Sequence, residues 1–182
     1  MTHPLNVLKH EHRVIERALR ALDGVCFRLE WGQHVPPEVL LQLVDFISTF
    51  ADRYHHGKEE RYLFPVLQRQ GIQRDEGALG VIEQEHRIEG ELAAEMGRAI
   101  IEYRDAESKQ RFVVAARRYT AHLLGHIDKE DGILLRLADE ILDDEDKASL
   151  REGFERADAE LGAGANEKYD GIASELERVW AL

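Results

Sequence analysis

The chain has 182 residues, of which 43% are hydrophobic and 33% charged, a composition that predicts one folded domain with a core and argues against disorder. Its formal net charge of −12 repels phosphate backbones, so nucleic acid is a poor candidate partner. With one cysteine, no signal-peptide core and no run of about 18 apolar residues, we expect a cytoplasmic protein without disulfides or membrane spans.

Apolar residues recur at three- and four-residue spacing along most of the chain, which is the period of an α-helix. The pattern predicts four long helices over residues 5–30, 37–69, 75–104 and 108–142. Short connections favour antiparallel neighbours, so the expected fold is all-α, an up-down-up-down four-helix bundle over residues 1–145. Two shorter helices, near 146–161 and 166–181, are expected to form a C-terminal extension (146–182) that packs on the outside of the bundle.

An internal repeat divides the predicted bundle into two similar helical hairpins. The segment EHR at 11–13 recurs at 85–87, an offset of 74 residues. The segment HHGKEE at 55–60 recurs as HIDKED at 126–131, an offset of 71 residues. Because the two offsets are nearly equal, the repeat predicts a pseudo-twofold site between the hairpins.

Each long helix places a histidine on its apolar stripe, and two helices add a glutamate one turn later. Residues four apart share a helix face, and a carboxylate in a core is costly unless it is paired or binds a metal. Hydrogen-bonded pairs are one explanation, but a metal would compensate both carboxylates at once. Imidazole and carboxylate suit iron, manganese or zinc, and bundles build di-iron sites from all four helices. The predicted metal ligands are His12, His55, Glu59, His86, His126 and Glu130.

Other polar side chains lie near this stripe. His56 is expected to be peripheral, because the residues one or two turns before it form a polar face of Thr49, Asp52 and Arg53. Further candidates for the site or its surroundings are Glu16, Glu60, His122 and Asp131. The histidines expected to be solvated are His3, His10 and His34.

The segment HHGKEERYLFP at 55–65 resembles the second-helix signature of the hemerythrin-like (HHE cation-binding) domains. The segments KHEHR at 9–13, QEHR at 84–87 and HIDKED at 126–131 resemble the other three signatures, so the resemblance covers residues 5–140. It implies a carboxylate-bridged pair of non-heme iron ions. In that pattern His12 and His55 serve one iron, His86 and His126 serve the other, and Glu59 and Glu130 bridge them.

The chain departs from the oxygen-carrying hemerythrins at one position. They have a second histidine four residues after the third-helix histidine, where this chain has Gly90. We therefore expect a position near Gly90 that is vacant or filled by a carboxylate such as Glu16, so the resemblance does not extend to reversible oxygen carriage. Close helix packing is the other explanation for this glycine.

The expected function is to handle or sense a small oxidant (dioxygen, peroxide or nitric oxide) or iron, as a metal- and oxygen-binding protein rather than a dedicated enzyme. One alternative is a di-iron enzyme that removes peroxide. Another is a structural or partner-binding bundle with a relic metal site. The sequence leaves the oligomeric state open.

Overall fold

The computed structural model describes residues 3–73, 77–101 and 106–182. All elements in these ranges are helical, and no strand occurs among them. In chain order they are α1 (Pro4–Glu30), α2 (Pro37–Phe46), η1 (Ile47–His56), η2 (Glu59–Leu63), α3 (Phe64–Arg69), α4 (Ala78–Ile101), α5 (Ala106–Lys129), η3 (Glu130–Leu134), α6 (Leu135–Ile141), α7 (Asp144–Leu161) and α8 (Ala165–Trp180). The three η segments are π-helical.

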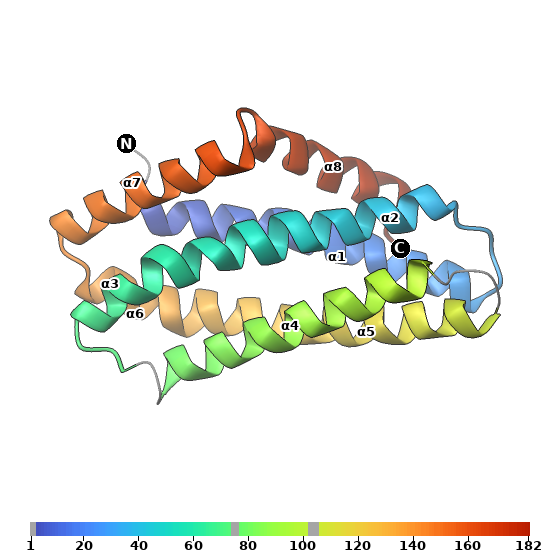
Figure 1. Ribbon diagram of the computed structural model, residues 1–182, viewed down its shortest axis with the longest axis horizontal. Coiled ribbons are helices and arrows are strands. Elements are labelled where there is room, and N and C mark those ends of the chain that lie inside the picture. The colour runs from blue at the N-terminus through green and yellow to red at the C-terminus, as the bar shows by residue number, and fades with distance from the viewer. Residues whose placement is uncertain (1–2, 74–76, 102–105) are drawn as a thin grey trace.

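The predicted bundle is confirmed. Four rods lie side by side and alternate in direction: α1, the run from α2 to α3, α4, and the run from α5 to α6 (Figure 1). The chain breaks between the first two rods where Gly32 takes a φ of +69°, and Pro37 then begins α2, where its missing N–H costs nothing. The predicted break at 105–108 lies partly outside the described residues.

The second and fourth rods are not the uninterrupted α-helices that the sequence predicts. Each contains π-helical turns, which bond residue i to i+5 and so shift every later side chain around the axis. In the fourth rod, Ile133 of η3 is exposed. Leu134 and Leu135 are buried instead. The π turns therefore decide which residues face the centre of the bundle.

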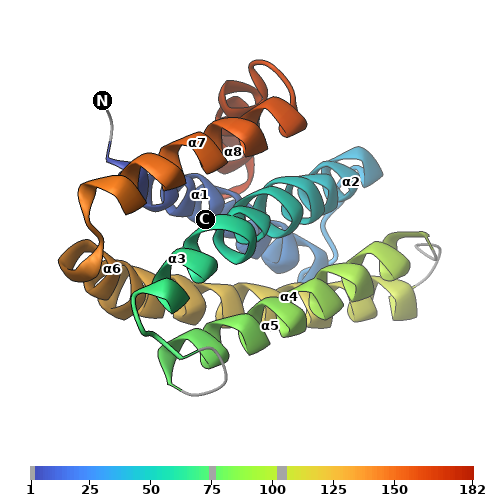
Figure 2. The ribbon, with the colours of Figure 1, turned by 60° about the vertical axis from the view of Figure 1, so that its left-hand side comes forward.

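The C-terminal helices pack on the outside of the bundle, along α1 (Figures 1 and 2). The Asp143 side chain caps α7 by accepting a hydrogen bond from the Asp146 N–H at 2.8 Å. Phe154 of α7 and Leu176 of α8 are buried in the same hydrophobic clusters as the bundle rods. None of the described helices is long and apolar enough to cross a membrane.

Candidate metal centre

Four histidines, one from each rod, meet in the middle of the bundle with two glutamates between them. His12 Nε2 and His126 Nε2 lie 3.1 and 3.3 Å from Glu130 Oε2. The Glu59 carboxylate lies 3.7 Å from the Nε2 of His55 and 3.5 Å from the Nε2 of His86. All six side chains are at most 4% exposed. The structure thus brings together every residue that the sequence predicts as a ligand.

The six residues form two overlapping groups of four. In each group, one donor atom per residue lies within 4.8 Å of the others. The groups are His12, His55, Glu59 and Glu130, and His86, His126, Glu59 and Glu130. Both glutamates belong to both groups.

The inward-facing atoms of this centre are unsatisfied. No hydrogen bond reaches the Nε2 of any of the four histidines, or either carboxylate oxygen of Glu59 and Glu130, from the described residues. Buried polar atoms without partners cost free energy and are rare in folded proteins. A cation would satisfy all of them together, so the donor set fits a metal site built from imidazole nitrogen and carboxylate oxygen.

The outward-facing Nδ1 atom of each histidine, by contrast, donates to a carboxylate. The pairs are His12 with Asp131 at 2.7 Å, His55 with Glu11 at 2.9 Å, His86 with Glu60 at 2.8 Å and His126 with Glu85 at 3.1 Å. Such outer carboxylates are typical partners of metal-binding histidines, because they fix the ring and leave the other nitrogen free for the ion.

A family model described as the hemerythrin HHE cation binding domain matches residues 3–138. The chain belongs to this family. The match includes all six central residues and ends within α6, so α7 and α8 lie outside it. No curated protein and no solved structure gives a significant match.

The outer carboxylates of this HHE domain follow the sequence repeat. Glu11 and Glu85 precede the first and third histidines, and each accepts from a lysine as well: Lys58 in one half and Lys129 in the other. Glu60 and Asp131 also correspond by the repeat. The sequence prediction assigns no role to Glu11, Glu85 or the two lysines, although the glutamate and the lysine recur at the same two offsets as the histidines.

The two central glutamates differ in their preference for a proton. Burial raises the pKa of Glu59 to about 8, and the adjacent Glu130 carboxylate adds to this effect. Burial also opposes ionisation of Glu130, but His126 and His12 outweigh it and hold the Glu130 pKa well below its usual value. For His12, the carboxylates of Asp131 and Glu130 overcome burial and raise the pKa to about 10. Two carboxylates this close do not both ionise readily unless positive charge lies beside them.

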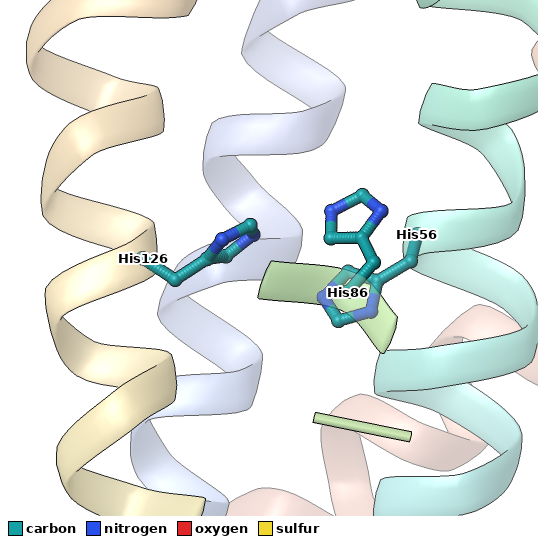
Figure 3. A group of neighbouring side chains, drawn as sticks. All are labelled: His56, His86 and His126. Carbon is teal, nitrogen blue, oxygen red and sulfur yellow. The ribbon is translucent and has the colours of Figure 1, made fainter. Parts of the chain in front are cut away.

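His56 is also part of this centre, and the expectation that it is peripheral is wrong. Its side chain is 2% exposed, and neither ring nitrogen has a hydrogen-bond partner among the described residues. The ring stacks on His86 with centroids 4.0 Å apart and lies 5.4 Å from the His126 ring. Figure 3 shows these three imidazoles pointing toward one another from three rods. His56 is the last residue of η1, a π-helical segment.

Glu89 is the second buried group that the sequence prediction missed. Its Oε1 accepts from His122 Nδ1 at 2.9 Å, and its Oε2 lies 3.6 Å from His56 Nε2. His122 is therefore a supporting group, as one alternative suggested. Glu89 follows His86 by three residues, and residues three apart share a helix face just as residues four apart do. The sequence prediction considers only the residue four positions after His86, which is Gly90.

The structure places a carboxylate beside Gly90, as one of the two expected arrangements has it. A side chain at Gly90 would meet Asp52 Oδ1 at 3.8 Å, so this residue lies beside η1. The nearby carboxylate is that of Asp52 and not that of Glu16, which pairs with Arg13 at 3.0 Å. Of the histidines expected to be solvated, His10 and His34 are exposed and His3 is partly buried.

Proposed function

We propose that this HHE domain binds two non-heme iron ions and handles or senses a small oxidant, such as dioxygen, peroxide or nitric oxide, or iron itself. The observation that carries the proposal is the set of unsatisfied Nε2 atoms around two shared glutamates. His12 and His55 would hold one ion, and His86 and His126 the other. Glu59 and Glu130 would bridge them. Manganese and zinc accept the same donors and are the alternatives for the metal.

The burial of the centre supports a reactant of a few atoms. Because the six side chains are at most 4% exposed, a large substrate cannot contact the metals without opening the bundle. When bound, iron supplies redox chemistry and open coordination positions. The protein keeps each imidazole oriented through its outer carboxylate and excludes bulk water from the centre.

Elemental analysis of protein purified without chelators, together with its optical spectrum, tests the proposal. About two irons per chain would support it, and much less than one metal of any kind would contradict it and favour the relic bundle. Added peroxide then separates binding from catalysis. Steady turnover would show an enzyme, whereas one stoichiometric oxidation would fit a sensor or an iron-handling protein. A His10→Ala variant, altered at an exposed histidine, is the matched control for both measurements.

A further inference from the structure

The two halves of the centre are not equivalent, although the repeat relates them. By the offset of 71 residues, His56 corresponds to Ile127, and by the offset of 74 residues, Glu89 corresponds to Ile15. All four side chains are buried. The half that contains His86 and His126 thus gains an extra imidazole and carboxylate, where the other half has two apolar residues.

His56 has the surroundings of a ligand rather than those of an ordinary core histidine. A buried core histidine normally hydrogen-bonds at least one ring nitrogen, but both nitrogens of His56 lack a partner in the part of the chain that the structure describes. One of them lies within 4.8 Å of ring nitrogens of His86 and His126, and the three residues form a potential metal-binding group. If position 56 only had to pack against apolar neighbours, isoleucine would be sufficient, as it is at the corresponding position 127.

We propose that His56 is a fifth imidazole ligand, which binds the metal held by His86 and His126. This inference rests on the proposed di-metal function. It makes the two metals unlike: one has two imidazoles, from His12 and His55, and the other has three. The third-helix position that supplies an extra histidine in oxygen carriers is Gly90 here. The extra imidazole would instead come from the second rod.

The local geometry allows either nitrogen of His56 to bind. Its Nδ1 lies 3.8 Å from Asp52 Oδ1, and its Nε2 lies 3.6 Å from Glu89 Oε2. Whichever nitrogen binds the metal, a small rotation of the ring would bring the other nitrogen within hydrogen-bond distance of a carboxylate. The neighbouring His55 serves the other half of the centre, where its Nε2 faces Glu59. His55 and His56, which are adjacent residues of η1, would thus each provide a ligand to a different metal.

The test compares the parent with His56→Ile, which copies the residue at 127, and with the exposed control His10→Ala. Each protein is loaded with ⁵⁷Fe(II) and oxidised. Iron per chain, the rate of iron removal by a chelator, and the Mössbauer spectrum are then measured. For the parent and control we expect two irons and two distinct quadrupole doublets of equal area. For His56→Ile we expect one iron to be lost about tenfold faster, with a change in one doublet only.

Two irons in His56→Ile, with parental removal rates and spectrum, would overturn the role of His56 and leave the di-iron proposal standing. A parent that binds no metal would instead overturn the proposed function, and this inference with it. Circular dichroism checks that each variant is folded. If His56→Ile is unfolded, His56→Gln is measured in its place. It keeps a polar side chain but removes the imidazole, so the same loss of one iron is expected.

Discussion

Lys58 and Lys129 hold the same position in the two repeats, but the Lys58 side chain is completely buried whereas that of Lys129 is 44% exposed. Each donates to the glutamate that also holds a histidine of the centre. Two aromatic rings cover Lys58 Nζ: the Tyr54 ring of the same rod at 4.0 Å and the Phe154 ring of α7 at 5.1 Å. The repeat has Gly125 where the first half has Tyr54. Tyr54 and α7 together therefore cover Lys58, whereas the matching Lys129 in the other half of the centre is in contact with solvent.

This asymmetry predicts unequal effects of removing the two outer glutamates. Glu11→Ala leaves Lys58 charged and unpaired in the core, and we expect a loss of about 3–5 kcal/mol in the free energy of unfolding. Glu85→Ala leaves Lys129 in contact with water, so mainly the lost partner of the buried His126 Nδ1 counts, and we expect a smaller loss of about 1–3 kcal/mol. Denaturant unfolding in excess chelator measures both without a contribution from metal. Equal losses would show that the burial of Lys58 has no energetic role.

The shared glutamates predict a difference in metal stoichiometry. Glu59 and Glu130 each belong to both groups of donors, so Glu59→Ala and Glu130→Ala should each lose both metals. His12 belongs to only one group, and His12→Ala should retain the metal on the opposite side. Metal analysis after gel filtration gives the counts. Loss of both metals from His12→Ala would show that the two sites fill cooperatively and are not separable.

Metal removal should lower thermal stability. The inward nitrogens and carboxylate oxygens have no hydrogen-bond partner within residues 3–73, 77–101 and 106–182, and a ligand that binds only the folded state stabilises it by mass action. At a free metal concentration of 100 times Kd, this contribution is about 2.7 kcal/mol. We expect the melting temperature to fall after chelation and to recover when Fe(II) is added without oxygen. An unchanged melting temperature in a protein shown to bind iron would contradict this prediction.

Cys26 should be inert in the folded protein. It is completely buried in α1, and burial raises the pKa of its thiol to about 12. Because the thiolate is the reactive form, a disulfide reagent at pH 8 should modify the chain only as fast as it unfolds. The rate should match that of unfolding and rise sharply in denaturant. Rapid stoichiometric labelling of the native protein would show that α1 opens locally around Cys26.

The sequence was sufficient to predict the bundle and the convergence of six residues, because apolar spacing and the repeat both depend on local geometry. The sequence analysis did not predict the π turns, although one spacing in the sequence indicates them. Ala51, His55, Glu59 and Leu63 follow one another in steps of four. Four residues of an α-helix turn through about 400°, so a strict four-residue stripe drifts by about 40° at each step. The wider π turns keep all four buried.

The prediction that His56 is peripheral is wrong because it considers one helix at a time. In an α-helix, successive side chains point about 100° apart, so a buried His55 predicts a neighbour on another face. That other face is solvated in an isolated amphipathic helix. Here it is covered by α4, where His86 and Glu89 lie against His56. Which faces are covered depends on the packing of rods far apart in sequence, and local periodicity contains no information about it.

The last prediction concerns Gly24, where α1 meets the end of α8. A Cβ atom there would lie 1.9 Å from the carbonyl oxygen of Trp180, and Arg28 Nη1 donates to this same oxygen at 2.7 Å. Gly24→Ala must therefore push the end of α8 away from α1 and break that hydrogen bond. We expect a loss of about 1–3 kcal/mol in the free energy of unfolding. Hydrogen exchange should also become faster at the C-terminal end of α8.

Gly171→Ala in α8 is the matched control for this substitution. No atom lies within 4 Å of the added Cβ, and alanine is favoured over glycine inside a helix by about 0.5–1 kcal/mol. This variant should therefore be as stable as the parent or slightly more stable in denaturant unfolding. If Gly24→Ala matched it in both stability and hydrogen exchange, α8 would not be held against α1 in solution at the distance that the structure shows.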